Sequence, residues 1–116
     1  MGSVLIVEDD APIRRGVLAL LTMRGHAAVA AESVAQAGAL LDAATPSHLL
    51  LDLNLPDGPG TEVLRRIRTQ SLPVQVALMT GGSDEALMTQ ARELGVDAVF
   101  VKPPDWDKLL DWVAKS

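Results

Sequence analysis

Apolar and polar positions alternate in blocks along the whole chain. Short apolar runs rich in Val, Leu or Ile predict strands over residues 4–7, 27–31, 49–51, 74–79 and 98–101. The run at 27–31 holds only alanine and one valine, so it is the weakest strand signal of the set. Most of these runs are continuously apolar, which is typical of strands buried on both faces of a parallel sheet.

Helical signals fill the segments between the strands. Helices are predicted from Pro12 to near Gly25, from a Ser33 cap to Ala44, from Thr61 to Arg68, from a Ser83 cap to Gly95, and from Asp105 to Lys115. Residues 54–60 are rich in proline and glycine and predict a turn-rich loop. Strict alternation of strands and helices predicts parallel strands with right-handed crossovers, packed as a three-layer α/β sandwich. The pattern alone leaves the strand order open.

Polar residues stand directly after four of the apolar runs. The acidic run Glu8–Asp10 follows the first, and Asp52, Thr80 and Lys102 follow the third, fourth and fifth. Because all strands of a parallel sheet point the same way, these residues should share one edge, where ligands of such sheets bind. We therefore expect one site that combines carboxylates, a hydroxyl and a fixed cation.

The carboxylates suggest a metal and a nucleophile. Asp9 and Asp10 are adjacent acids, and such a pair gains by sharing a hard cation such as Mg²⁺. A solvated loop, or an Asp10 that only caps the first helix, is the alternative. Asp52 follows the most apolar stretch of the chain and is a candidate nucleophile that becomes an aspartyl phosphate, or else a simple loop acid.

The other two strand ends suit a phosphoryl group. Thr80 can donate a hydrogen bond to a phosphoryl oxygen, and Gly81 beside it leaves room for a phosphate to enter. Lys102 can supply a point charge, unless it simply leaves the sheet for solvent. The Lys102–Pro103 bond is a candidate for the cis form, which is a minority state of such bonds.

Bulk properties narrow the class of protein. The 116 residues fit one domain. The formal net charge of -5 argues against binding of a nucleic-acid backbone by this domain itself, although an attached domain could bind one. The chain has no cysteine, which excludes disulfides and thiolate metal sites and is compatible with a reducing compartment. No apolar run approaches a membrane span, and we see no signal peptide, so we expect no membrane contact.

Four segments and their order carry a family resemblance: VLIVEDD, DLNLPDGPG, the apolar run ending in Thr80, and GVDAVFVKP. By these segments the chain resembles the receiver domain of two-component response regulators over essentially all of residues 1–116. The resemblance implies a flavodoxin-like (βα)5 fold with a parallel sheet of order 2-1-3-4-5, in a single cytoplasmic receiver domain. It implies that Asp52 accepts a phosphoryl group from a histidine kinase or histidine phosphotransfer protein. By the same resemblance, Mg²⁺ is bound by Asp9, Asp10, Asp52 and the backbone carbonyl of Asn54.

The resemblance also assigns the remaining site residues. Thr80 matches the hydroxyl that moves toward the phosphoryl group, and Lys102 matches the lysine that contacts a phosphoryl oxygen, with Pro103 in the cis-prone position. Val99 stands where the family often has an aromatic gate, and strand alternation should turn Phe100 to the opposite face. Gly82 lacks a side chain to screen the phosphate from water, so we expect no unusually long-lived phosphorylated state.

The leading interpretation is a phosphorylatable signalling switch that controls an output domain or partner and catalyses only its own phosphorylation and dephosphorylation. A phosphorylation-independent interaction module on the same fold is the first alternative. A phosphatase of the haloacid dehalogenase type is the second, but Asp52-Leu53-Asn54 lacks the second acid of the usual Asp-x-Asp motif.

Overall fold

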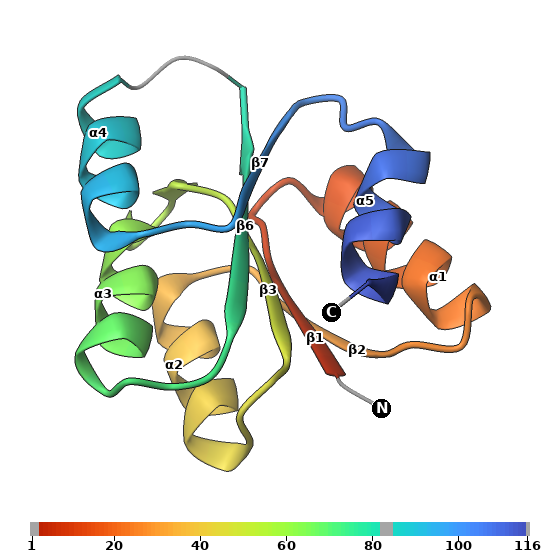
Figure 1. Ribbon diagram of the computed structural model, residues 1–116, viewed down its shortest axis with the longest axis horizontal. Coiled ribbons are helices and arrows are strands. Elements are labelled where there is room, and N and C mark those ends of the chain that lie inside the picture. Colours follow the sequence, from red (N-terminus) through yellow and green to blue (C-terminus); the bar gives the residue numbers. More distant parts are fainter. Residues whose placement is uncertain (1–2, 82–84, 116) are drawn as a thin grey trace.

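The computed structural model describes residues 3–81 and 85–115, and their central feature is a five-stranded parallel sheet (Figure 1). Its strands are β1 (Ser3–Val7), β2 (Ala27–Ala31), β3 (His48–Leu51), β6 (Gln75–Thr80) and β7 (Ala98–Val101). They run in the order β2-β1-β3-β6-β7. Counted along the chain, this is the order 2-1-3-4-5 that the family resemblance implied, so the flavodoxin-like fold is confirmed.

Helices cover both faces of the sheet. They are α1 (Ala11–Met23), α2 (Val34–Ala43), α3 (Thr61–Thr69), α4 (Glu85–Leu94) and α5 (Trp106–Ala114). Figure 1 shows α1 and α5 on one face and α2, α3 and α4 on the other. The predicted three-layer sandwich is therefore correct, and each predicted element is present with ends shifted by a few residues at most.

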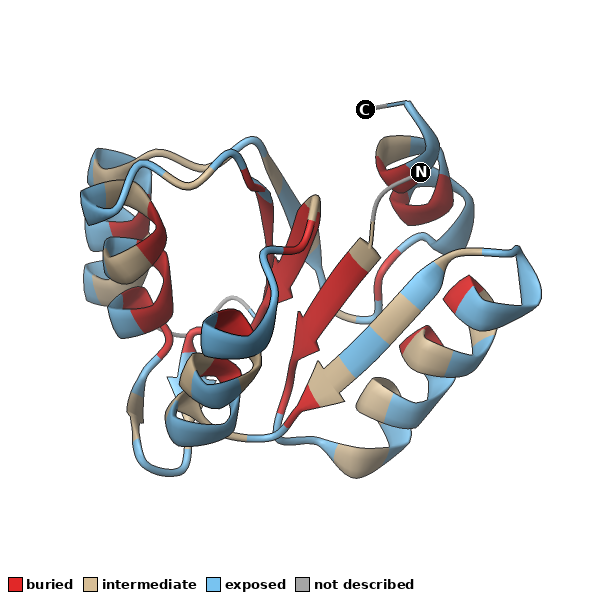
Figure 2. Ribbon diagram, turned by 90° about the horizontal axis from the view of Figure 1, so that it is seen from below, coloured by how far each residue is buried: buried red, intermediate tan, exposed pale blue. Residues whose placement is uncertain are grey.

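The core consists of two apolar clusters separated by the sheet. Alternate residues of β3 feed opposite clusters: Leu49 and Leu51 pack toward α2 and α3, whereas Leu50 packs toward α1 and α5. All residues of β3 are buried, and the middle strands are the red ribbons of Figure 2. A strand buried on both faces explains why its sequence is continuously apolar instead of alternating.

Side-chain caps define where the helices begin. Asp10 accepts a hydrogen bond from the N–H of Ile13 at 3.1 Å, and Ser33 accepts one from Gln36 at 3.1 Å, so both side chains cap helix N-termini. Ser33 is the cap that the sequence predicts. The predicted cap Ser83 and the glycine at position 82 lie outside the described residues.

The segment after β3 is more regular than predicted. Within the predicted turn-rich loop, it forms a short antiparallel pair, β4 (Asn54–Leu55) and β5 (Gly58–Pro59). Gly58 has a φ of 156°, a conformation that L side chains rarely adopt. The glycine and prolines that suggested a loop are thus the residues that close a hairpin.

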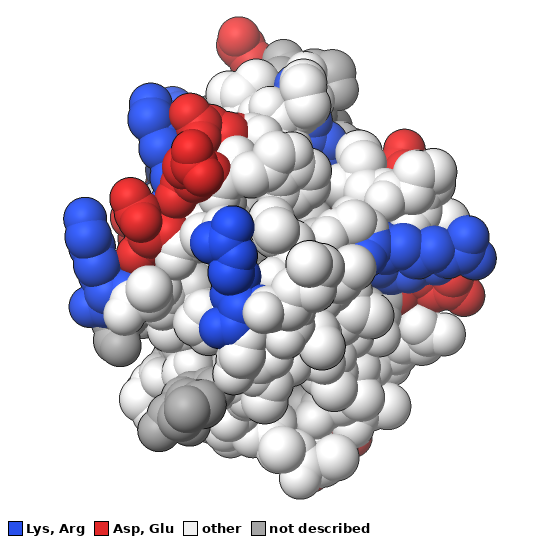
Figure 3. Space-filling model, turned by 90° about the vertical axis from the view of Figure 1, so that its right-hand side faces the viewer, with Lys and Arg blue, Asp and Glu red and all other residues white. Residues whose placement is uncertain are grey.

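Among the described residues, no helix is both long and apolar enough to cross a membrane. Figure 3 looks onto the side of α1 and α5, where acidic and basic side chains are interspersed and form no continuous basic patch among the described residues of that face.

Candidate functional site

The carboxyl ends of the central strands meet at one edge of the sheet, as predicted. The N–H of Asp52 donates to the carbonyl of Val7 at 2.9 Å, which ties the end of β3 to that of β1. The N–H of Lys102 donates to the carbonyl of Thr80 at 2.7 Å, which ties the end of β7 to that of β6. Ladder hydrogen bonds therefore place these polar residues at the same height in the sheet.

Lys102 links two carboxylates at this edge. Its Nζ donates to Oε1 of Glu8 at 2.5 Å and to Oδ2 of Asp52 at 3.2 Å. The side chain of Glu8 is fully buried, and those of Asp52 and Lys102 are 7% and 17% exposed. Ion pairs this sheltered from water are screened far less than surface pairs, so the lysine is a strong local charge.

The protonation equilibria of Glu8 and Lys102 reflect burial and mutual contact. Burial raises the pKa of Glu8 to about 8, assisted by the neighbouring Asp52 carboxyl and opposed by Lys102. Burial alone would lower the pKa of Lys102, but its hydrogen bond to Glu8 and the charges of both carboxylates raise it. The lysine is thus held as an ammonium, and burial makes Glu8 harder to ionise than an ordinary glutamate.

The acidic group differs from the predicted pair in one member. One carboxylate oxygen from each of Glu8, Asp9 and Asp52 lies within 4.8 Å of the others, among the described residues. Asp10 does not belong to this group, because its carboxylate caps α1 instead. The capping alternative that the sequence left open for Asp10 is therefore the observed one, and Glu8 takes the place predicted for it in the cluster.

A sequence signal for this assignment was available. Asp is a preferred N-cap, and Asp10 stands two residues before Pro12, a residue common in the first turn of helices. Assigning Asp10 to the cap would have left Glu8 and Asp9 as the pair that faces Asp52.

The donor set suits a hard divalent cation. Carboxylate oxygens are the ligands that Mg²⁺ prefers in proteins, usually together with waters and phosphate oxygens. Oε2 of Glu8 is buried and accepts no hydrogen bond from any described residue. A buried carboxylate oxygen without a donor, next to two further carboxylates, fits a site that a cation completes.

The hairpin after β3 shapes the surroundings of Asp52. The N–H of Asn54 donates to Oδ1 of Asp52 at 3.1 Å, which orients the carboxylate. A Cβ on Gly60 would lie 2.2 Å from the carbonyl oxygen of Asp52, closer than real Cβ contacts. Only glycine can let the chain return this closely behind Asp52.

The remaining predicted residues lie at the ends of β6 and β7. Thr80 is buried at the end of β6 and, with Val99 and Val101, lines a hollow of about 380 Å³ against α4. Val99 is 38% exposed, and Phe100 turns to the opposite face, where its ring packs at 6.2 Å from that of Trp112. No aromatic side chain thus lies at the position of the family's gate.

Three further features of this edge concern Gly81, Pro103 and Arg14. A Cβ on Gly81 would meet nothing within 4 Å, in agreement with open space beside Thr80. The Lys102–Pro103 peptide bond is cis. Arg14, which sequence reasoning did not connect with the site, donates to the carbonyls of Glu8 and Asp9 at 3.0 and 3.2 Å and so orders the backbone of the acidic run.

Comparison with known proteins identifies relatives over nearly the whole chain. The sequence model described as "Response regulator receiver domain" matches residues 4–114. The acid tolerance regulatory protein ActR of Rhizobium meliloti is 35% identical over 108 residues, which cover 93% of this chain and 56% of that protein. The KDP operon transcriptional regulatory protein KdpE of Escherichia coli is 41% identical over 105 residues, covering 89% of this chain and 45% of that protein. The chain thus spans about half the length of these relatives.

Solved structures share the fold. A CheY-like response regulator receiver domain protein from Methanospirillum hungatei superposes with a TM-score of 0.91 at 24% identity, over 99% of this chain and 92% of that one. This likeness concerns the fold alone. A DNA-binding response regulator of the LuxR family from Staphylococcus aureus superposes with a TM-score of 0.88 at 26% identity, over 99% of this chain and 98% of that one.

Proposed function

Because this chain belongs to the family of response regulator receiver domains, which are phosphoacceptor signalling switches, we propose that Asp52 is its phosphoacceptor. The phosphoryl group comes from the phosphohistidine of a histidine kinase or a histidine phosphotransfer protein. The observation that carries this assignment is the contact of Lys102 Nζ with Asp52 Oδ2 at 3.2 Å, inside a group of three carboxylates.

The chemistry follows from the groups that face Asp52. A carboxylate oxygen of Asp52 attacks phosphorus and forms the new O–P bond while the N–P bond to the donor histidine breaks. The donor ring takes up a proton from solvent and leaves as neutral imidazole. Lys102 remains as the fixed cation that contacts a phosphoryl oxygen, because the transferred group brings roughly two negative charges to the edge. The N–H of Asn54 keeps the attacking carboxylate oriented.

Magnesium is the cofactor that these residues fit. Glu8, Asp9 and Asp52 would hold it through carboxylate oxygens, and Asn54 through its backbone carbonyl. When bound, Mg²⁺ neutralises charge on the phosphoryl oxygens and helps to orient them. This ligand set keeps the predicted Asp9, Asp52 and Asn54, and replaces Asp10 by Glu8, because the carboxylate of Asp10 serves α1.

The switch itself involves Thr80 and the segment that follows β6. The Thr80 hydroxyl moves toward the phosphoryl group, and the open space beside Gly81 admits that group. With Val99 in place of an aromatic gate, the readout relies on movement of this segment and of α4. Because glycine at position 82 has no side chain, we expect the phosphorylated state not to be unusually long-lived. A lifetime unchanged or shortened by a bulky residue at this position would contradict this.

The remaining assignments describe the biological setting. Residues 1–116 act as a single receiver domain with no activity on an external metabolite, in the cytoplasm, without direct contact to nucleic acid or membrane. The output is an attached domain or a separate partner. Relatives such as KdpE, which are about twice as long as this chain, are named as transcriptional regulators.

The test uses the purified chain with Mg²⁺ and acetyl phosphate as donor, read by intact mass. A single phosphoryl adduct that requires Mg²⁺ and is absent from the matched Asp52→Asn variant is the expected result. A beryllofluoride mimic gives a second readout that does not depend on donor choice, because it binds to the acceptor carboxylate directly.

The outcomes separate the two candidate functions. If neither the adduct nor beryllofluoride binding is observed, the phosphoacceptor proposal fails and the phosphorylation-independent interaction module takes its place. An adduct that persists in Asp52→Asn would place the acceptor on another residue.

A further inference from the structure

Strand β2 forms an open edge of the sheet. It pairs with β1 on one side, and within residues 3–81 and 85–115 no strand pairs with its other side. In Figure 2 the ribbon of β2 is pale blue and tan over most of its length, whereas β1 beside it is mostly red, with α1 and α2 to either side. An uncovered edge strand presents backbone N–H and C=O groups to whatever chain approaches.

The direction of these backbone groups follows from the ladder. The carbonyl of Ala31 accepts from the N–H of Glu8 at 3.0 Å, so Ala31 faces β1. Backbone groups of successive residues in a strand point to opposite sides, and Ala27 and Val29 therefore also face β1. Ala28 and Ala30 consequently direct their N–H and C=O groups outward, away from the sheet.

This edge lacks the features that usually prevent pairing. Residues 27–31 read Ala-Ala-Val-Ala-Ala, without a charge or a proline, and the ladder with β1 continues through all of them without a bulge. Natural edge strands are normally protected by lysine, proline, bulges or a covering element. Val29 is 49% exposed at the centre of the strand.

We propose that β2 is an interface through which two copies of this chain associate, with their β2 strands paired antiparallel about a two-fold axis at Val29. The sequence of the strand reads the same in both directions around Val29, as a two-fold contact requires. The two sheets would then join into one continuous sheet. This inference does not rest on the phosphoryl chemistry of Asp52.

The hydrogen-bond pattern matches this register. About an axis at Val29, Ala28 of one copy stands opposite Ala30 of the other, and these are the residues whose N–H and C=O groups point outward. Each such pair can exchange both of its hydrogen bonds, whereas the two Val29 residues form a non-hydrogen-bonded pair whose Cα atoms lie only ~4.5 Å apart. In a register shifted by one residue, a residue whose backbone N–H and C=O point outward would stand opposite a residue whose N–H and C=O point toward its own β1.

The ends of the strand are complementary in the same register. His26 of one copy stands opposite Glu32 of the other, so that a ring N–H faces a carboxylate and no like charges are opposed. The side chain of Glu32 is 55% exposed and already contacts Arg14 at 3.4 Å, which leaves carboxylate surface available. Opposite charges or donor and acceptor groups directly across two strands favour pairing.

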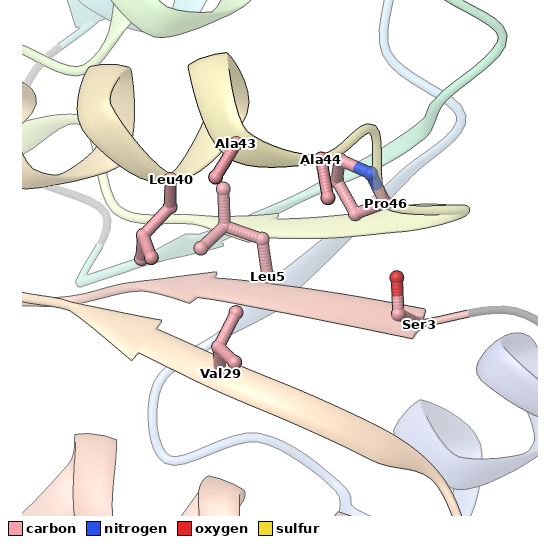
Figure 4. A pocket seen from close by; sticks show the side chains of 7 residues that line it. All are labelled: Ser3, Leu5, Val29, Leu40, Ala43, Ala44 and Pro46. Atoms are coloured by element: carbon pink, nitrogen blue, oxygen red, sulfur yellow. The ribbon is translucent and has the colours of Figure 1, made fainter.

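Apolar surface continues from the strand onto α2. Val29 borders a hollow of about 210 Å³ whose other walls include Leu5, Leu40 and Ala43 (Figure 4). In the proposed register the partner's Val29 would pack against Val29 on this same face. A short strand pair buries less area than a stable dimer interface, so the association should be weak and concentration-dependent.

Sedimentation equilibrium of the chain between roughly 10 μM and 1 mM covers the range of weak association. The wild-type chain should be monomeric at the low end and increasingly dimeric at the high end. Val29→Lys and Val29→Glu should each remain monomeric, because like charges would meet at the axis. An equimolar mixture of these two variants should dimerise again, because opposite charges then meet, and this recovery is specific to a contact of position 29 with itself.

The control is Val101→Lys, which changes an exposed valine on the opposite edge strand β7, 64% exposed against 49% for Val29, and should leave dimerisation unchanged. Circular dichroism confirms that each variant folds, and slowed hydrogen exchange of the Ala28 and Ala30 amides at high concentration reports on the strand pair without any substitution. A wild-type chain that is monomeric throughout overturns the proposal. So does a dimer that survives Val29→Lys, or a mixture of the two charged variants that stays monomeric.

Discussion

Nζ of Lys102 donates a hydrogen bond to the buried Oε1 of Glu8 at 2.5 Å, which joins the ends of β7 and β1. Two strands, β3 and β6, separate these strands in the sheet, and Lys102 also contacts Asp52 at the end of β3, at 3.2 Å. The lysine is therefore shared between the proposed phosphoacceptor and a carboxylate that has no other hydrogen-bond donor within residues 3–81 and 85–115.

Replacing this lysine should separate metal binding from phosphorylation. Lys102→Met removes a positive charge that competes with a cation for the same carboxylates, so Mg²⁺ affinity should rise on the order of threefold to tenfold. Formation of the phosphoryl adduct should fall, because the phosphoryl oxygens lose their fixed cation. Isothermal titration calorimetry and intact mass measure the two effects, and a fall in Mg²⁺ affinity would contradict this account of the site.

The three consecutive acids after β1 should have different roles. Asp9→Asn should lower Mg²⁺ affinity by roughly tenfold or more, about 1.4 kcal/mol of binding free energy, with little change in stability. Asp10→Ala should retain Mg²⁺ affinity but lose the cap of α1, at a cost of about 1 kcal/mol in the free energy of unfolding. Calorimetric titration and urea denaturation of both variants decide between the roles; a large loss of metal affinity in Asp10→Ala would restore the pair predicted from sequence.

Two glycines offer a matched test of the close approach behind Asp52. In Gly60→Ala the new Cβ would meet the carbonyl oxygen of Asp52 at 2.2 Å and Cα of Leu53 at 2.9 Å. Because backbone must shift, we expect a loss of about 1–3 kcal/mol in the free energy of unfolding. Gly16→Ala, in the interior of α1 with nothing within 4 Å of the new Cβ, should instead gain about 0.5–1 kcal/mol. Urea denaturation gives both values, and equal effects at the two positions would refute the steric argument.

His48 should make stability depend on pH. It is buried at the start of β3, with Nδ1 2.7 Å from Oγ of Ser47 and its ring edge-on to Trp112. Burial, and to a lesser extent the charge of His26, lower the pKa of His48 below its ordinary 6.5. As the pH falls below 6.5, the unfolded chain binds a proton that the folded chain does not, so the free energy of unfolding should decrease.

The measurement is denaturation of wild type and His48→Gln between about pH 7.5 and about pH 5, the interval in which histidine titrates. The difference between their unfolding free energies should change across this interval and level off above it. His26→Gln retains the buried imidazole and should keep most of the wild-type slope. Identical slopes for wild type and His48→Gln would show that the buried imidazole titrates normally.

Sequence patterning was sufficient for the fold and for the location of the site. The apolar runs around Leu50 and the polar residues that end them are local properties, and parallel strands bring their carboxyl ends to one edge. These predictions succeed because they depend only on the spacing of apolar residues along the chain and on the common direction of parallel strands. They require no knowledge of which distant residues come into contact.

Sequence alone could not rank neighbouring residues that compete for one role. Glu8, Asp9 and Asp10 are adjacent acids, and their roles depend on where β1 ends and α1 begins. A shift of this boundary by one residue would change which acid caps the helix and which acids face Asp52. The arginines show the same limit: Arg66 binds Asp42 and Arg68 binds the carbonyl of Gly95, contacts that no local pattern indicates. These partners are distant in the chain and come together only through packing of the helices.

The sequence by itself thus determined the order of the elements, the faces that are buried and the edge at which chemistry occurs, because these depend on local periodicity and on the common direction of parallel strands. Only the tertiary structure decided which acid joins Asp52 and Lys102, and which backbone groups of β2 point outward. Both depend on hydrogen bonds and charges between residues that are far apart in sequence, and such contacts exist only in the folded chain.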